Sequence, residues 1–469
     1  MRYVSTRGSA PALAFDDVLL TGLARDGGLY VPEAWPHWSE AELAALAGRP
    51  YAEIATAVMR PFVAGSAVEA QLPELAAETY RGFGHAAVAP LVQLERDLWL
   101  LELFHGPTLA FKDVAMQFLG RLFDAVLSAR GERVTIVGAT SGDTGSAAIE
   151  ACRGRERVDV FILHPRGRTS EVQRRQMTTV LADNVHNLAV EGTFDDCQDL
   201  VKALFNDHAF RDRLHLSAVN SINWARVLAQ IVYYFTAAVA LGAPGRPVSF
   251  VVPTGNFGNV LAGYAARRMG LPIERLVVAS NRNDILARFF DSGTMAMGTV
   301  EPSLSPSMDI QVSSNFERFL FELLDRDGPA VDRMLRDFRA SGRFSLPQGL
   351  HARAGESFTG FRLDDEGTLA EMRHWQETCG MQVDPHTAVG LAAARATGTA
   401  PGVPLVTLAT AHPAKFPDAV ERATGLRPAL PPRMADLYER PERFEVIAND
   451  AEALKAVVAD RARVLEAAA

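Results

Sequence analysis

The sequence predicts an α/β protein in which helices cover parallel sheets on both faces. From about Gly84, short apolar runs rich in β-branched residues alternate with amphipathic helical stretches, and a glycine-bearing loop follows several of the runs. The predicted strands are residues 133–137, 158–163, 248–252, 276–279 and 404–408. Such alternation is typical of doubly wound sheets, which bind ligands in the loops at the carboxyl ends of their strands.

Helices are predicted between these strands. A long polar helix begins at about Ser170, and another begins near Asp284. The segment DPHTAVGLAAARATG indicates a capped helix, with Asp384 at the N-cap and Pro385 in the first turn. A terminal helix is expected after about Asn449.

The 469 residues are too many for one compact core, and we expect two or three domains. The first 83 residues differ from the rest, because turn-forming DGGLYVPEAWP is followed by helical stretches with little strand signal. We therefore expect an N-terminal domain over residues 1–83, a larger α/β region over residues 84–440 and a C-terminal helical extension over residues 441–469.

Composition narrows the possible functions. The net charge of −9 argues against a general binder of nucleic acid or anionic membranes. The N-terminal residues lack the apolar run of a signal peptide, and the apolar stretch 227–243, which polar side chains interrupt, is better interpreted as a buried helix than as a membrane span. Cys152, Cys197 and Cys379 form no close pair, which indicates a reducing cytoplasm without disulfide bonds or a metal site.

The loop TGNFGN, between a predicted strand and a predicted helix, is a candidate phosphate site. Its two glycines allow a sharp turn, so that backbone N–H groups can point into one concavity at a helix N-terminus. The residues alone leave open a glycine turn without a ligand. The candidates are Thr254, Gly255, Asn256, Phe257, Gly258 and Asn259.

Two further loops carry polar residues at strand ends. In GATSGDTG, the hydroxyls of Ser141 and Thr144 and the N–H groups around Gly142 could bind a carboxylate, while Asp143 could accept from a ligand hydroxyl or only cap the helix. In TAHPAK, Thr410 follows a strand, and its hydroxyl either faces the ligand cleft or bonds to the local backbone.

Lys112 stands out because only four of the 47 basic residues are lysines. Unlike a guanidinium group, a lysine amine can lose its proton and form a Schiff base. The apolar neighbours of Lys112 would favour the neutral amine by desolvation. Asp113 would oppose this effect, so its side chain is expected to turn outward. A second lysine, Lys415, could bind an anion or lie in solvent, as could His412.

Together these features would hold pyridoxal phosphate. The aldehyde would react with Lys112, the phosphate would lie in the TGNFGN loop, and the ring nitrogen would lie opposite Thr410. No metal ion is expected.

Blocks along nearly the whole chain resemble the threonine synthases of the longer bacterial and fungal type. They include YVSTRG, FHGPTLAFKD, ATSGDTGSAA, SAVNSINWAR, PTGNFGN, SSNFER, DPHTAVG and TAHPAKFP. The resemblance implies the fold of the tryptophan synthase β subunit (fold type II of pyridoxal-phosphate enzymes), with two doubly wound α/β subdomains around the cofactor, and an extra N-terminal domain. It also implies conversion of O-phospho-L-homoserine and water to L-threonine and phosphate, the last step of threonine biosynthesis.

The resemblance also implies roles for individual residues. Lys112 would be the Schiff-base lysine and a proton shuttle, and Thr410 would face the ring nitrogen. Because the substrate has its own phosphate, SAVNSINWAR is the candidate for a second anion site, in which Arg226 offers a fork of donors; a surface helix arginine is the alternative. The implied substrate-binding residues are Ser141, Gly142, Asp143, Thr144, Asn220, Ser221, Asn223 and Arg226. Asn315 and Arg318 match the family pattern without an assigned step.

Three other functions remain open. A catabolic phospho-lyase would release an oxo acid without adding water, and a serine or threonine dehydratase would act on free hydroxyamino acids. A non-catalytic ligand sensor with this fold would need neither Lys112 nor both glycine loops. The expected partner is a small molecule, without nucleic acid or membrane, and the chain is expected to be a monomer or a homodimer.

Overall fold

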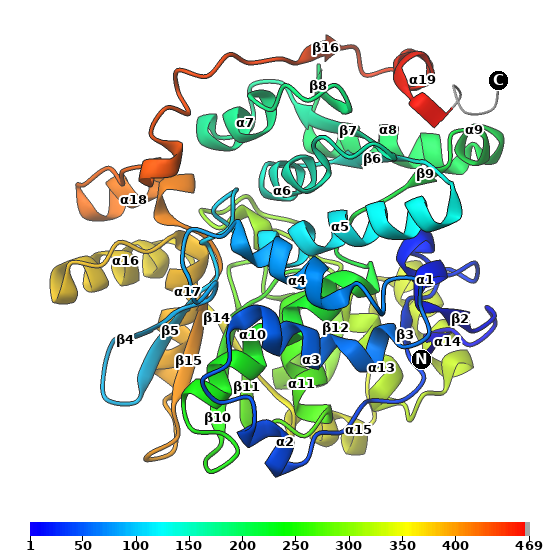
Figure 1. The fold of residues 1–469 in the computed structure, drawn as a ribbon. Coiled ribbons are helices and arrows are strands. Elements are labelled where there is room, and N and C mark those ends of the chain that lie inside the picture. Colours follow the sequence, from blue (N-terminus) through cyan, green and yellow to red (C-terminus); the bar gives the residue numbers. More distant parts are fainter. Residues whose placement is uncertain (465–469) are drawn as a thin grey trace.

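The computed structural model describes residues 1–464 of the chain (Figure 1). Its first part contains a small antiparallel sheet of order β2-β1-β3 and four helices. These elements are β1 (Arg2–Ser5), β2 (Leu13–Ala14), α1 (Phe15–Thr21), β3 (Tyr30–Pro32), α2 (Glu40–Ala44), α3 (Tyr51–Val63) and α4 (Leu72–Arg81). The sheet was not predicted, because its strands are too short to show an alternating pattern.

A five-stranded parallel sheet of order β16-β8-β7-β6-β9 forms one α/β layer structure, seen in the upper part of Figure 1. Its strands are β6 (Val134–Ala139), β7 (Val158–Pro165), β8 (Val185–Val190), β9 (Leu216–Ser217) and β16 (Glu445–Ile447). The helices around it are α5 (Lys112–Arg130), α6 (Asp143–Cys152), α7 (Glu171–Thr178), α8 (Phe194–Asn206), α9 (His208–Arg213) and α19 (Ala451–Arg461). The central strand β7 is buried along its whole length, as a parallel strand covered on both faces should be.

A six-stranded sheet of order β14-β11-β10-β15-β5-β4 forms the second layer structure, parallel except for the edge pair β4 and β5. Its strands are β4 (Leu91–Gln93), β5 (Leu98–Glu102), β10 (Val248–Pro253), β11 (Ile273–Ser280), β14 (Phe358–Arg362) and β15 (Leu405–Ala409). The helices of this part are α10 (Trp224–Ala240), α11 (Gly258–Arg268), α12 (Ile285–Ser292), α13 (Phe316–Leu323), α14 (Gly328–Ser341), α15 (Gln348–Gly355), α16 (Asp365–Cys379), α17 (Pro385–Thr397) and α18 (Pro417–Thr424). The remaining elements are the strand pair β12 (Thr294–Ala296) and β13 (Arg343–Ser345), and three short 3₁₀ helices, η1 (Pro306–Met308), η2 (Pro413–Lys415) and η3 (Pro432–Met434).

The predicted strands and helices are present. Strands β6, β7, β10, β11 and β15 coincide with the five predicted runs and differ only at their ends. Asp384 caps α17 by accepting from two backbone N–H groups, and Pro385 is the first residue of that helix. The helix after Ser170 is capped as well, but it ends at Thr178 and is shorter than expected.

The apolar stretch of residues 227–243 lies mainly in α10, which is buried along most of its length. Among the described residues, no helix is long and apolar enough to span a membrane.

The C-terminal part is not only helical. Residues 445–447 form β16, which adds a parallel strand to the edge of the five-stranded sheet beside β8. The segment that leads to β16 runs along the outside of that sheet, and the expected terminal helix, α19, follows β16 (Figure 1). A strand of three residues shows no periodicity, so only its pairing reveals it. The domain boundaries at residues 83 and 440 stay a prediction.

Aromatic residues of the N-terminal part pack against α10. The rings of Tyr3, Trp35 and Phe62 lie about 6 Å from that of Trp224, at the start of the helix. Trp224 directly follows the NSIN segment, so the N-terminal part supports one of the predicted ligand loops from behind.

Candidate active site

The three predicted ligand loops follow β6, β10 and β15 and begin at the carboxyl ends of parallel strands, where α/β sheets bind ligands. Lys112 joins them because it is the first residue of α5 and lies beside the β15 loop. The N–H of Phe111 donates to the carbonyl oxygen of Thr410 at 2.8 Å, and Ala110 pairs with Ala411. The backbone therefore brings the lysine and the threonine together across 298 positions of sequence, from 112 to 410.

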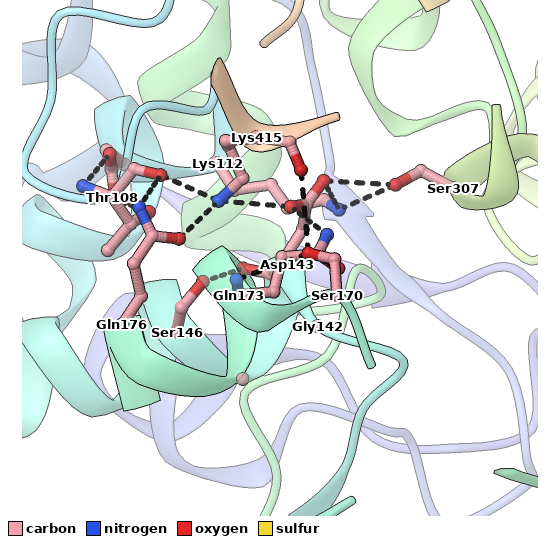
Figure 2. A network of polar contacts seen from close by, with 12 residues as sticks. Thr108, Lys112, Gly142, Asp143, Ser146, Ser170, Gln173, Gln176, Ser307 and Lys415 are labelled. Atoms are coloured by element: carbon pink, nitrogen blue, oxygen red, sulfur yellow. Dashed lines mark hydrogen bonds and ion pairs between the residues drawn. The ribbon is translucent and has the colours of Figure 1, made fainter. Parts of the chain in front are cut away.

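Two lysines share one buried carboxylate in this region (Figure 2). The amine Nζ of Lys112 lies 3.3 Å from Asp143 Oδ2, and Nζ of Lys415 lies 3.1 Å from Asp143 Oδ1. The side-chain amide of Gln173 also donates to Asp143 Oδ1, at 2.9 Å. The hydroxyl of Ser307 lies 3.2 Å from the amine of Lys112 and 3.1 Å from Asp143 Oδ2. Asp143 is thus the centre of a polar network and does not cap α6, whose N-cap is the preceding residue.

The network has a clear electrostatic effect on its members. Burial lowers the pKa of Lys112; Asp143 opposes this, and the positive charges of Lys415 and Arg226 add to it. Burial alone would raise the pKa of Asp143, but the two lysine ammonium groups hold it well below its usual range. The site therefore favours an ionised Asp143 beside an amine that loses its proton more readily than an exposed lysine.

The sequence led us to expect that the side chain of Asp113 faces solvent. In the structure it does not. Its carboxylate is buried and accepts from the N–H and the hydroxyl of Thr108, each at 2.7 Å. Burial raises the pKa of Asp113 to about 6. The expected outward orientation is therefore wrong, because Thr108 supplies the hydrogen bonds that solvent would have given.

The TGNFGN loop leaves a row of backbone donors free at the start of α11. Phe257 is the N-cap, with a left-handed φ of +61°. The N–H groups of residues 255–259 donate to no other residue in the described range 1–464. These groups suit a phosphate at a helix N-terminus.

Side chains of the same loop have other roles. The hydroxyl of Thr254 donates to the Val252 carbonyl oxygen, and Asn259 Oδ1 accepts from the hydroxyls of Tyr233 and Tyr234. The ring of Phe257 packs among other phenylalanines. The side chains of the predicted cofactor residues Thr254, Phe257 and Asn259 therefore hold the loop in place, and the free donors belong to the backbone.

Thr410 is buried, and its hydroxyl makes no hydrogen bond within residues 1–464. A local backbone bond, the alternative interpretation of this threonine, is absent over that range. The hydroxyl is therefore available to a ligand atom.

The SGDTG loop only partly matches its predicted role. The N–H of Gly142 donates to Thr140 Oγ1 at 2.9 Å, so it is not free for a carboxylate as predicted. Gly142 has φ +148°, and a Cβ atom there would lie 2.5 Å from Gln173, which explains the glycine. Ser141 is exposed and Thr144 is half-buried at the first turn of α6, so both remain available.

The NSINWAR segment places an incompletely paired arginine inside the protein. Arg226 is buried, which excludes the surface position considered from the sequence. It donates to the Val219 carbonyl oxygen at 3.0 Å, and its Nε has no partner in the described chain. Burial lowers the pKa of Arg226 to about 10. A buried guanidinium with spare donors is suited to an anion.

The other residues of this segment differ among themselves. Asn223 caps α10 by accepting from Ala225 N–H, and its amide donates to the Leu19 carbonyl oxygen, so it is used by the fold and is not the free donor predicted. Asn220 is exposed. The hydroxyl of Ser221 lies 3.2 Å from that of Ser314.

Asn315 and Arg318, without an assigned role from the sequence, tie the loops together. The Asn315 amide donates to the carbonyl oxygens of Ser221 and Asn256, at 3.1 and 3.0 Å. Arg318 donates to the carbonyl oxygen of Tyr30 in the N-terminal part. The SSNFER block thus connects the NSINWAR segment, the TGNFGN loop and the N-terminal part.

Sequence reasoning missed several residues of the network, among them Ser307, Gln173 and Gln176, whose side-chain oxygen accepts from Lys415 at 2.8 Å. The two glutamines lie three positions apart on α7 and so share one face of that helix, a spacing visible in the sequence. Ser307 lies in the short 3₁₀ helix η1, and its N–H donates to His386 Nε2 at 3.2 Å. No local pattern marks such a residue.

Three protein-family models match successive parts of the chain. The family described as "Threonine synthase N terminus" matches residues 2–80, "Pyridoxal-phosphate dependent enzyme" matches 83–334, and "Threonine synthase, C-terminal" matches 387–458.

The relatives match over nearly full length. The chain is 58% identical to a threonine synthase of Pseudomonas aeruginosa, over 98% of each chain. It superposes with a TM-score of 0.97 on a pyridoxal-phosphate-bound threonine synthase of Brucella melitensis (53% identity, 99% of this chain and 100% of that one). The TM-score with the yeast threonine synthase is 0.94 (41% identity, 98% of each chain). These likenesses confirm fold type II with an extra N-terminal domain, and the chain belongs to the threonine synthase family of pyridoxal-phosphate-dependent enzymes.

Proposed function

We propose that the protein is a threonine synthase, a carbon–oxygen lyase that converts O-phospho-L-homoserine and water to L-threonine and phosphate by γ-elimination and β-addition of water. The observation that carries this proposal is the spare hydrogen-bonding capacity of buried Arg226, beside loops that already offer one phosphate site. A substrate with its own phosphate needs a second anion site. Free serine or threonine does not.

The residues present fit pyridoxal phosphate. The free N–H groups of residues 255–259 would hold its phosphate, the Thr410 hydroxyl would face its ring nitrogen, and the Lys112 amine would bind its aldehyde carbon. When bound, the cofactor supplies an electron sink for negative charge that develops on the substrate. A neutral hydroxyl cannot hold a proton on the ring nitrogen as a carboxylate does, so Thr410 favours elimination and replacement over transamination.

Lys112 would move the proton at the reacting carbon. Its amine lies against Asp143 and Ser307, at 3.3 and 3.2 Å, and these contacts aim it into the site. Because burial lowers its pKa, the amine can be neutral nearer to neutral pH than an exposed lysine and can accept a proton.

The substrate would be held at its two ends. Arg226 would bind the phosphate through its free donors, with Asn220 and Ser221 at the rim. Ser141, Thr144 and the first N–H groups of α6 would bind the carboxylate. Asp143 would orient the Lys112 amine rather than bind a hydroxyl, because both of its oxygens are engaged by protein donors.

Product analysis with purified protein, pyridoxal phosphate and O-phospho-L-homoserine tests this function. We expect equal amounts of threonine and phosphate. Oxobutyrate in place of threonine would identify a phospho-lyase, and turnover of free threonine or serine at a comparable rate would identify a dehydratase. A protein that takes up no borohydride-fixable cofactor would be a ligand sensor.

Two finer proposals accompany the function. We place the protein in the cytoplasm, because its cysteines are unpaired: Cys152 and Cys197 are buried as thiols, and Cys379 is exposed. A monomer or a homodimer remains the proposed assembly.

A further inference from the structure

A second lysine lies against the same carboxylate as Lys112. Lys415 ends the short helix η2, after β15, and its side chain is completely buried. Its ammonium nitrogen lies 3.1 Å from Asp143 Oδ1, 2.8 Å from Gln176 Oε1 and 2.7 Å from the carbonyl oxygen of Thr108 (Figure 2). The contacts to Gln176 and Thr108 are hydrogen bonds and the contact to Asp143 is an ion pair, so protein oxygens surround this ammonium group.

Lys112 is bound less completely than Lys415. Within residues 1–464, its nitrogen contacts Asp143 Oδ2 and Ser307 Oγ and no other polar atom, so one of its three donor positions is free over that range. Asp143 therefore carries a lysine on each oxygen. Its single negative charge can compensate only one of the two positive charges.

We propose that Lys415 is a positioning residue, which fixes Asp143 beside Lys112 and whose charge opposes a proton on the Lys112 amine. This inference rests on the proposed function, in which Lys112 carries the cofactor. It explains which of two lysines on one carboxylate reacts: Lys415 is fully engaged, and Lys112 is the amine that can leave its partners.

The charged groups around Lys112 come from three elements. Asp143 on α6 attracts a proton to the amine, while Lys415 on η2 and Arg226 on α10 repel it. His386 on α17 accepts from the N–H of Ser307, and a positive charge on its ring also lowers the pKa of Asp143. If Lys415 lost its charge, Lys112 would be the one lysine that still pairs with Asp143 among the described residues, and the Lys112 amine would hold its proton to higher pH.

Because the chain has only four lysines, the titration of the Lys112 amine can be measured directly. In the full-length, cofactor-free protein labelled with ¹³C at the lysine ε-carbon, four side-chain signals are expected, and loss of one signal in each single-lysine variant assigns them. In Lys415→Met we expect the titration midpoint of Lys112 to rise by about one pH unit. The matched control is Lys202→Met, the same chemical change at an exposed side chain that pairs with Asp199, and it should leave the midpoint in place.

An unchanged or lower midpoint in a folded Lys415→Met variant would overturn the proposal, because a purely structural role does not raise the proton affinity of Lys112. If that variant does not fold, the double variant Lys415→Met/Asp143→Asn is compared with Asp143→Asn. The double variant should show the higher Lys112 midpoint, since it lacks the repelling charge. Equal midpoints would again overturn the proposal.

A separate measurement tests the underlying function. Borohydride reduction of the wild-type holoenzyme, followed by peptide mapping, should place the cofactor on Lys112. Cofactor on Lys415 would refute the site assignment itself, whereas cofactor on Lys112 with an unchanged midpoint in Lys415→Met would refute only the role of Lys415.

Discussion

Two buried arginines near the site, Arg226 and Arg318, use their donors in opposite ways. Burial lowers the pKa of both, to about 10 for Arg226 and to about 9 for Arg318, and Arg226 has no carboxylate within ion-pairing distance in residues 1–464. Arg318 donates to the carbonyl oxygens of Tyr30 and Ile222 and to the side chain of Asn315. Arg226 donates to one carbonyl oxygen and keeps Nε without a partner in the same range.

This difference indicates a structural role for Arg318 and a ligand-binding role for Arg226. A buried cation whose donors all bind protein oxygens holds elements of the fold together. For a buried cation with spare donors, the desolvation cost is fully offset only when a ligand binds. The lysines repeat the contrast, since Lys415 is fully engaged and Lys112 is not. The four residues thus form two pairs, and the predictions for Arg318 and Arg226 test one pair directly.

The largest effect is expected at Lys112. Lys112→Arg keeps a positive charge but removes the amine that we propose binds the cofactor aldehyde, so turnover should be lost and no cofactor should be fixed by borohydride. Activity assays and mass spectrometry of the reduced protein measure both outcomes. Lys202→Arg, on the surface, is the control and should behave as wild type. A Lys112→Arg protein that still fixes cofactor would show that another lysine carries it.

Arg318→Gln should mainly destabilise the fold. The shorter side chain leaves the carbonyl oxygens of Tyr30 and Ile222 without their donor and loosens the contact between the N-terminal part and the site. We expect a loss of about 3 kcal/mol in the free energy of unfolding, measured by denaturant titration. If stability is retained while kcat/KM for O-phospho-L-homoserine falls, the roles of the two arginines are interchanged.

Arg226→Gln should have the reverse profile. Loss of a charge-assisted contact to a buried phosphate should cost about 2–3 kcal/mol, or roughly 30- to 150-fold in kcat/KM for O-phospho-L-homoserine. Stability should be unchanged or higher, because a buried charge without a carboxylate is removed. Cofactor content should stay the same.

The role of Arg226 is tested by comparing the loss of kcat/KM for O-phospho-L-homoserine with the loss for an unphosphorylated analogue. Such a substrate never used the contact and should lose far less of its kcat/KM. Equal losses for both substrates would move Arg226 out of the site, and the second anion site would then have to be sought in the SSNFER block.

The positions of the site loops could be predicted from the sequence better than the side-chain contacts within the site. The strand–loop–helix rhythm placed TGNFGN, SGDTG and TAHPAK at strand ends, because parallel strands impose one ligand-binding edge. Composition singled out Lys112, although its role stays a prediction. These signals are local in the chain or general to the fold class.

What could not be predicted depends on contacts between distant segments. The pairing of Lys415 with Asp143 joins residues 272 positions apart, from 143 to 415. Asn223 and Asn259 matched the expected pattern, yet their side chains are consumed by a helix cap and by two tyrosines. The sequence identifies a side chain that can form hydrogen bonds, but only the folded structure shows whether that side chain already has a partner within the protein.

The smallest effect is expected in the TGNFGN loop, where spare donors belong to the backbone. A Cβ atom at Gly258 would lie 3.3 Å from Asn315 Nδ2, a side chain that can yield slightly. Gly258→Ala should therefore crowd the free N–H groups and weaken pyridoxal phosphate binding by about 1 kcal/mol, roughly fivefold in Kd, without loss of stability. Equilibrium titration of the cofactor-free protein with pyridoxal phosphate measures this change.

Gly255→Ala sharpens the test, because its Cβ atom would lie 2.7 Å from the backbone carbonyl oxygen of Ser307, which cannot yield without moving the loop that contacts Lys112. This variant should lose both stability and cofactor affinity, and Gly258→Ala only the latter. Gly349→Ala, in α15, meets no atom within 4 Å and serves as the matched control. Wild-type cofactor affinity in both loop variants would mean that the phosphate is held elsewhere, and the free N–H groups of residues 255–259 would then be an ordinary helix start.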